Sequence, residues 1–197
     1  MSLRPVGPVP AKVMLVLDAP SDMDINLGSL LAKGGAADEL ATALVNAKFS
    51  LAMCRTVTFL PSRPPGRDMN NWFPEDKKSI TSDHILINGR HVHKDAEQWL
   101  ATLRQEVEFC QPTVIIAFGN AAMWALTGEW GIMSWRGSTL RATLPAAYVS
   151  GPPVVIPTHT PGMILAKQEW RPLFRRDIQR AADIAGRAGD DDDRSHL

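Results

Sequence analysis

Apolar residues gather in four short segments of the chain, separated by polar and proline-rich stretches. Residues 12–17, 53–60, 113–118 and 154–157 are rich in aliphatic, β-branched and aromatic side chains. Runs of this length that stop at Pro, Gly or Asp are typical of strands covered on both faces. The pattern therefore predicts four buried strands.

Between these runs, apolar residues recur at helical spacing. They do so over residues 36–47, 95–109 and 168–185, and the short segment 121–126 follows a Gly-Asn turn. Apolar positions three and four residues apart form one stripe of an amphipathic helix, so we predict helices over these four segments. Residues 135–144 alternate apolar and polar side chains, which predicts a peripheral hairpin.

The alternation of strands and helices predicts an α/β fold. We expect a three-layer αβα sandwich with a central, mainly parallel, four-stranded sheet. The chain has 197 residues, which suits a single domain. The expected organisation is an irregular lead-in over residues 1–11, one domain over residues 12–185, and a disordered acidic tail over residues 186–197.

Composition places limits on the partners. Twenty-one Lys and Arg balance twenty-one Asp and Glu, so the chain has no overall basic field of the kind found in many nonspecific DNA binders. Four of the carboxylates are consecutive in the tail, Asp190 to Asp193. The body without the tail is therefore net basic, and local patches decide what it binds.

Metals, cofactors and membranes are not indicated. Cys54 and Cys110 are too few for a disulfide framework, a four-cysteine zinc site or an iron–sulfur cluster, and we expect two buried, reduced thiols. His84, His91 and His93 lack the further ligands of a tetrahedral zinc site. No segment has the roughly 20 apolar residues that span a bilayer. We expect no cofactor, no metal and a cytoplasmic protein.

Polar residues that suit chemistry follow the predicted strands. In parallel sheets, ligands bind beyond the carboxyl ends of the strands, which points to the loops 18–35, 61–72, 119–122 and 158–165. These loops contain carboxylates, arginines and a histidine. Such groups suit acid–base chemistry and phosphate binding.

Several of these loops resemble one family in order along the chain. Leu17-Asp18-Ala19-Pro20-Ser21, the Gly119-Asn120-Ala121-Ala122 turn, the Arg136-Gly137 pair and the IPTHTPGMIL segment of residues 156–165 are similar to motifs of the family 4, thermostable and phage-type uracil-DNA glycosylases. The resemblance covers most of residues 12–182. It implies the αβα glycosylase fold and hydrolysis of the N-glycosidic bond of uracil or a modified base in DNA, as in base-excision repair.

The resemblance also implies roles for individual residues. Asp18 stands where the family has its first-motif glutamate, which activates water or stabilises the cationic sugar. Asp24 is the second acidic candidate, and His159 is expected to help the leaving base. The residues expected to bind the base or the DNA are Leu31, Asn120, Thr160, Arg63, Arg67, Arg136 and Met163.

Three departures keep other functions open. Thr160, and not His159, aligns with the family's catalytic histidine; the stacking aromatic is replaced by Leu31; and the family's Arg-Pro-Pro-Xaa-Asn-Arg loop lacks its Asn at Gly66-Arg67. The alternative function is a catalytically inactive glycosylase-fold module that binds DNA or a protein in replication, as occurs with certain phage polymerases. A pocket that holds Asp18, Asn120 and His159 together would favour the enzyme; a histidine turned away would favour the module.

Structural roles compete with each of these assignments. Asp18 suits a turn cap, Asn120 suits a helix cap, and Met163 suits either core packing or insertion between bases. Trp72 and Trp135 are the tryptophans whose loops allow stacking on bases. A nucleotide-binding protein unrelated to glycosylases is the third possibility, although the chain has neither a Walker nor a Gly-Xaa-Gly-Xaa-Xaa-Gly sequence.

Overall fold

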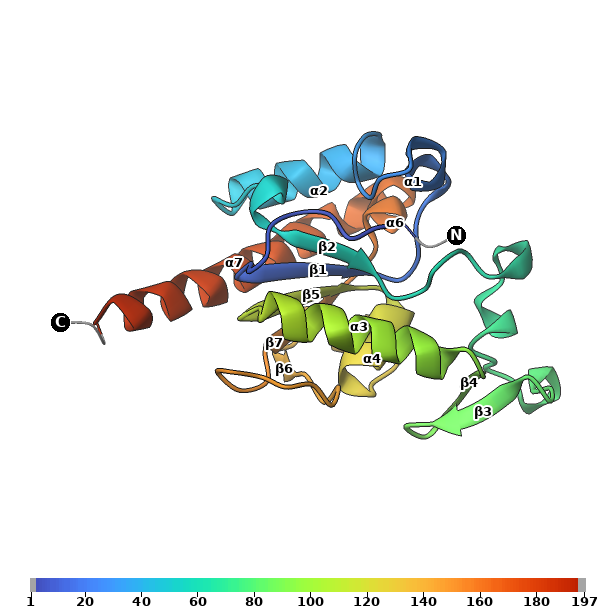
Figure 1. Cartoon of the computed structure of the whole chain (residues 1–197). Helices are drawn as coiled ribbons and strands as arrows, with labels where there is room; N and C mark the ends of the chain where they lie inside the picture. Colours follow the sequence, from blue (N-terminus) through green and yellow to red (C-terminus); the bar gives the residue numbers. More distant parts are fainter. Residues whose placement is uncertain (1–2, 195–197) are drawn as a thin grey trace.

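A five-stranded, mainly parallel sheet forms the centre of the protein (Figure 1). The computed structural model describes residues 3–194, with side chains through residue 187. The prediction of an α/β fold is confirmed, but the predicted number of four strands is wrong. The strands, in spatial order, are β2 (Arg55–Thr58), β1 (Val13–Leu17), β5 (Val114–Phe118), β7 (Val154–Thr158) and β6 (Leu140–Arg141).

The fifth strand corrects the prediction for residues 135–144. Trp135 ends a short helix, α5 (Ile132–Trp135), and β6 pairs antiparallel with β7, so no separate hairpin forms. The other neighbours in the sheet are parallel, with Leu17 opposite both Thr58 and Phe118. Because their ends are in register, the carboxyl ends of β1, β2, β5 and β7 lie at one edge.

Helices cover both faces of the sheet (Figure 1). On one face, alternate residues of the strands pack against α2 and α7; on the other, the intervening residues pack against α3 and α4. Every residue of β1, β5 and β7 is buried, which explains their continuous apolar runs. These helices are α2 (Gly35–Asn46), α3 (Ala96–Cys110), α4 (Asn120–Thr127) and α7 (Arg171–Arg194).

Two short helices occupy loops at the carboxyl edge that were predicted to be irregular. Helix α1 (Asp22–Leu27) follows β1, and α6 (Pro161–Ala166) follows β7. Ser21 caps α1, and Thr160 caps α6 ahead of Pro161. A Ser cap and a Thr-Pro cap are both sequence signals for the start of a helix, so these two helices could have been predicted.

The long segment between β2 and α3 packs through an aromatic cluster. Phe73 is fully buried and lies 5.5 Å from Trp124 and 5.3 Å from Trp130, between ring centroids. The segment also contains a two-stranded hairpin that the sequence did not predict, β3 (His84–Ile87) with β4 (Arg90–His93). The short 3-10 helices of the chain are Leu51–Met53, Pro65–Arg67, Met69–Asn71, Lys77–Ser79 and Gln168–Trp170.

The last helix extends beyond the body of the protein (Figure 1). The sequence predicts a disordered tail from residue 186, whereas the backbone of α7 continues to Arg194. Alanine and arginine in this stretch are good helix formers. The side chains of Asp190 to Asp193 and the backbone of residues 195–197 lie outside the described part of the chain.

Both cysteines are buried and unpaired, as predicted: Cys54 and Cys110 are free thiols. Burial raises the pKa of Cys54 to about 12, which makes it unreactive at neutral pH. No helix in the described part of the chain is long and apolar enough to cross a membrane.

We expect Phe73→Ala to destabilise the protein by about 3–5 kcal/mol, because it opens a cavity among Phe59, Trp124 and Trp130. Phe109→Ala is the matched control, because this ring is 66% exposed on α3; its expected effect is within about 0.5 kcal/mol. Urea denaturation measures both variants. Equal losses of stability would show that the aromatic cluster does not stabilise the long segment.

Candidate functional site

A pocket of about 250 Å³ opens at the carboxyl ends of β1 and β2. It lies between the loop after β2, helix α1 and the start of α6. Aliphatic and proline side chains form most of its wall, and no aromatic ring lines it. The lining residues are Leu17, Asp18, Ala19, Ser21, Asp24, Leu31, Ala36, Arg63, Pro64, Arg67, Met69, Thr160, Pro161 and Gly162.

Asp18 joins the end of β1 to the beginning of α4. Its Oδ1 accepts the backbone N–H of Ala122 at 2.7 Å. Burial raises the pKa of Asp18 from its ordinary value of 3.8 to about 7, although the N–H groups of Ala122, Ala121 and Asn120 favour the ionised form. The pocket therefore contains a carboxyl group that changes its charge near neutral pH.

Gly119 allows this carboxyl group to lie against the backbone. Its φ is +97°, and a Cβ atom at this position would lie 2.0 Å from Oδ2 of Asp18. A residue with a side chain would have to adopt a strained conformation and displace the carboxylate. The Gly119-Asn120 turn after β5 is thus a packing requirement for Asp18.

Asp24 shapes the pocket through hydrogen bonds. It is 3% exposed. Its Oδ2 accepts the N–H and the hydroxyl of Ser21 at 2.7 and 2.6 Å, and its Oδ1 accepts the N–H of Leu31 at 2.6 Å. Both carboxylate oxygens therefore hold the α1 loop together, and Leu31, with a φ of +50°, is fixed in the pocket wall.

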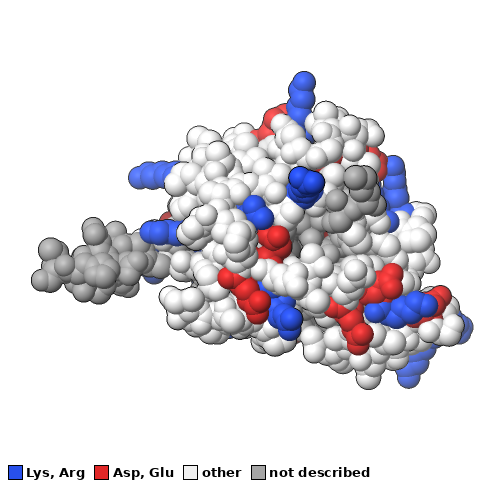
Figure 2. Space-filling model, in the orientation of Figure 1, with Lys and Arg blue, Asp and Glu red and all other residues white. Residues whose placement is uncertain are grey.

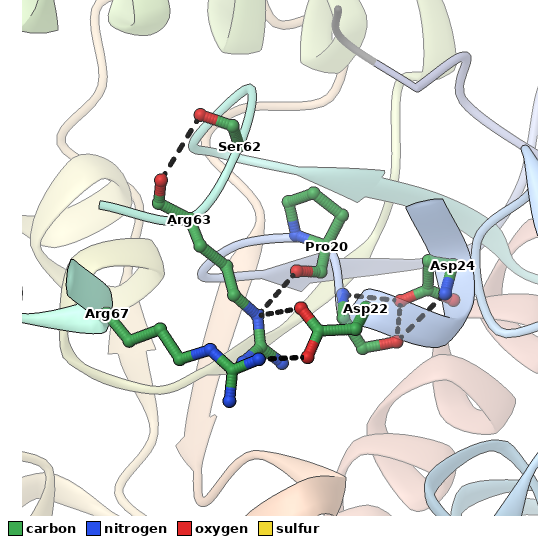
Figure 3. Close-up of polar contacts among 7 residues, drawn as sticks. Pro20, Asp22, Asp24, Ser62, Arg63 and Arg67 are labelled. Atoms are coloured by element: carbon green, nitrogen blue, oxygen red, sulfur yellow. Dashed lines mark hydrogen bonds and ion pairs between the residues drawn. The ribbon is translucent and has the colours of Figure 1, made fainter. Parts of the chain in front are cut away.

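Two arginines lie at the rim, bridged by Asp22 (Figure 3). Nη2 of Arg67 donates to Oδ2 of Asp22 at 2.6 Å, and Nε of Arg63 lies 3.6 Å from Oδ1. Nε of Arg63 also donates to the carbonyl of Pro20 at 3.2 Å. Among the described residues, the terminal nitrogens of Arg63 make no hydrogen bond, so they are available to a ligand.

Thr160 reaches the pocket, but the neighbouring histidine does not. Oγ1 of Thr160 caps α6 by accepting the N–H of Met163 at 3.3 Å. The His159 ring is 3% exposed and stacks on Trp170, with centroids 4.4 Å apart. Burial, Arg136 and Lys167 lower the pKa of His159, so this ring is neutral at pH 7. His159 is absent from the pocket lining.

Asn120, Arg136 and Met163 are also outside the pocket lining. Oδ1 of Asn120 accepts the N–H of Ile132 at 2.7 Å, which fixes the α4–α5 connection. Arg136 binds the buried carboxylate of Asp177 through Nε and Nη2, at 3.2 and 2.5 Å. Met163 is 42% exposed on α6.

The remaining aromatic and histidine candidates have structural contacts. The ring centroid of Trp72 lies 4.8 Å from that of Trp99, and Trp135 is partly buried against the hydrophobic core. Nδ1 of His84 contacts Thr81, and the His93 ring stacks on Trp99 at 5.9 Å. The described residues contain no group of three His, Cys, Asp or Glu side chains able to hold a metal ion.

The sequence did not predict three features of the site, which are the hydrogen bonds between Ser21 and Asp24, the position of Met69 and the ion pairs of Asp22 at the rim. Ser21 and Asp24 form a capping box, and the Ser-Xaa-Xaa-Asp spacing was a usable signal. Met69 enters the pocket from a 3-10 helix, and no local pattern marks it. Asp22 pairs with the rim arginines, which depends on a contact across about 40 residues of chain that spacing alone does not reveal.

The arrangement combines an ionisable acid, cationic donors and a mainly apolar cavity. A carboxylate can stabilise a developing cation or accept a proton, and a guanidinium can donate hydrogen bonds to an oxyanion. Asp18 and Arg63 supply these groups in one pocket. This chemistry suits a ligand with a planar apolar body and polar edges.

We expect Gly119→Ala to destabilise the protein by about 1–3 kcal/mol more than Gly128→Ala. Both glycines have positive φ and flank the same helix, but a Cβ at Gly128 meets nothing within 4 Å. Urea denaturation gives the difference. In an Asp18→Ala background the excess should shrink, because the clashing carboxylate is gone while the backbone strain at Gly119 remains. An excess of the same size in both backgrounds would contradict the proposed contact.

The pKa of Asp18 also predicts a pH dependence of stability. Its value of about 7 in the folded protein is above the value of 3.8 for an unperturbed group. The folded state therefore binds more protons between these values, and the free energy of unfolding should fall as pH rises from about 4 to about 7. We expect Asp18→Asn to reduce this fall, measured by urea unfolding at pH 5 and pH 8. Identical pH dependence in both proteins would contradict the raised pKa.

Known protein families and curated proteins give no indication of the function of this chain. Neither the protein-family models nor the curated protein sequences contain a match to this chain. The function is therefore inferred from the pocket at the carboxyl edge of the sheet, and above all from Asp18.

Proposed function

We propose that the protein is a DNA glycosylase-like hydrolase that takes a nucleobase into the Asp18 pocket and cleaves its N-glycosidic bond. The observation that carries the proposal is the carboxyl group of Asp18, which lines an open pocket and has its pKa raised to about 7. Strongly perturbed acids in clefts are typical of catalytic sites. The glycosylase fold itself belongs to the proposal, supported by the motifs at the strand ends.

Asp18 suits the charge that develops on the sugar. Cleavage of a glycosidic bond passes through an oxocarbenium-like transition state, which a nearby carboxylate stabilises. The same group can accept a proton from the attacking water. Both roles require the ionised form. The reaction should therefore accelerate as pH rises towards about 7 and then level off.

Arg63 suits the departing base. The leaving base acquires negative charge, which hydrogen-bond donors stabilise. Nε of Arg63 is held by Pro20, which positions its terminal nitrogens at the pocket rim (Figure 3). In this proposal Arg63 takes the place that the sequence analysis gave to His159.

The walls suit a flipped base. A base outside the duplex needs apolar contact on its faces and polar contact at its edges. Leu31, Pro64 and Met69 supply apolar surface, and Thr160 supplies a hydroxyl. The volume of about 250 Å³ admits a nucleobase.

A second candidate is a module that binds DNA or a replication protein without cleaving the bond. It is favoured by the positions of His159 and Asn120, which contact Trp170 and Ile132 instead of lining the pocket. The pocket then binds a base without a dedicated acid for the leaving group. The two candidates share DNA binding and differ in base release.

We expect release of free base from single- or double-stranded oligonucleotides that contain uracil or a modified base. Asp18→Asn should lower the rate at least about 100-fold, because the amide cannot stabilise a cation or accept a proton. Arg63→Gln should lower it by roughly 100-fold through loss of the oxyanion donor. Alkali-labile strand breaks measure the abasic product. Asp38→Asn, an exposed carboxylate outside the pocket, is the matched control.

The outcomes separate the two candidates. Release that Asp18→Asn abolishes and Asp38→Asn does not would support the hydrolase. DNA binding without release from any substrate would support the binding module. Release that persists in Asp18→Asn would contradict the role given to this carboxyl group.

A further inference from the structure

A second hollow lies along helix α7, outside the Asp18 pocket. It is a polar groove of about 760 Å³ between α7 and the segment that leads from α5 to β6. Four arginines line this groove, and none of them lines the Asp18 pocket: Arg136, Arg176, Arg180 and Arg187. We call it the arginine groove.

One arginine and one carboxylate form its buried floor. Asp177 is 2% exposed and accepts hydrogen bonds from Arg136 at 3.2 and 2.5 Å and from Thr158 at 2.8 Å. A Cβ atom at Gly137 would lie 2.6 Å from the same carboxylate, so only glycine fits there. Asp177 and Arg136 thus neutralise each other's charge, and this pair forms part of the wall of the groove.

The exposed part of the groove has excess positive charge. Within the part of the chain whose side chains are described, no carboxylate lies within ion-pair distance of Arg176, Arg180 or Arg187. Asp183 is the remaining carboxylate of the lining. Among the described side chains of the exposed lining, three guanidinium groups against one carboxylate leave two positive charges in excess. The face shown in Figure 2, by contrast, mixes acidic and basic side chains.

The spacing of these arginines suits a linear polyanion. Arg176, Arg180 and Arg187 are four and seven residues apart on one helix, which places them on one face over about 16 Å. A DNA strand in a duplex has one phosphate per about 3.4 Å of axis, so this stripe spans several phosphates. Guanidinium groups match phosphate oxygens in pairs. Thr139 and Gln179 add neutral polar groups to the lining.

The end of β7 and the start of α6 connect the floor of the groove with the Asp18 pocket, although the two linings share no residue. Thr158 binds the carboxylate on the groove floor, and Thr160 lines the pocket. These residues are two positions apart, so their Cα atoms are separated by at most about 7.6 Å. Thr158 is buried, so this link is internal, but it fixes the groove on one side of the pocket.

We propose that the arginine groove binds the phosphate backbone of the DNA strand on one side of the base held in the Asp18 pocket. This inference rests on the proposed function for the identity of the polyanion. The groove is a positioning surface: it raises affinity for DNA and leaves the chemical step to the pocket. Its contribution is electrostatic and depends on salt.

The test compares two triple variants of the full chain. Arg176→Gln/Arg180→Gln/Arg187→Gln removes the exposed arginines of the groove, and Arg4→Gln/Lys12→Gln/Lys48→Gln removes three exposed cations elsewhere. Fluorescence anisotropy with a labelled single-stranded oligonucleotide gives the binding constant over a range of NaCl concentrations. The slope of log K against log salt is negative, and each phosphate contact contributes about 0.7 to its size. Loss of three contacts in the groove variant should therefore make the slope shallower by roughly 2. Urea denaturation verifies that both variants fold.

Each outcome bears on the groove separately from the chemistry. A slope made shallower only in the groove variant supports the inference, even if the wild-type protein releases no base and the hydrolase proposal fails. Equal slopes in both variants overturn it. Absence of DNA binding, with binding of poly-glutamate that the groove variant loses, also overturns it and indicates an acidic protein partner.

Discussion

The contact between Asp18 and the beginning of helix α4 determines the geometry of the carboxyl edge. The carboxylate accepts the N–H of Ala122 and lies against Gly119, so the ends of β1 and β5 are tied together at the floor of the pocket. The same burial that permits this contact raises the pKa of Asp18 to about 7. Structural and chemical roles therefore coincide in one side chain, and a substitution there affects both.

The other carboxylates of the site define its shape. Asp24 holds the α1 loop and Leu31, Asp22 bridges the rim arginines, and Asp177 anchors Arg136 beneath the arginine groove. Each accepts hydrogen bonds or ion pairs that fix backbone or cationic groups. Burial raises the pKa of both Asp18 and Asp177, but Asp177 is bound to Arg136 and Thr158 outside the pocket, whereas Asp18 lines the pocket. This difference is the physical reason for placing the chemistry at Asp18.

Local patterns in the sequence predicted the buried strands and the long helices, because continuous apolar runs and helical spacing depend on neighbouring residues. They also placed Asp18 and Thr160 at the carboxyl edge, where both line the pocket. They predicted a separate hairpin over residues 135–144, which includes β6, but not that β6 joins the main sheet, because that depends on its pairing with β7. The direction of the His159 ring likewise depends on Trp170, which approaches from a later element.

The most direct test of the central claim is the titration of the Asp18 carboxyl group, followed by its carbon-13 resonance with and without DNA. Asp18→Asn assigns the signal. The account predicts a midpoint near pH 7 in the free protein and a different midpoint when an oligonucleotide occupies the pocket. A midpoint near 4 that DNA leaves unchanged would contradict the assignment of this carboxyl group to a nucleobase site.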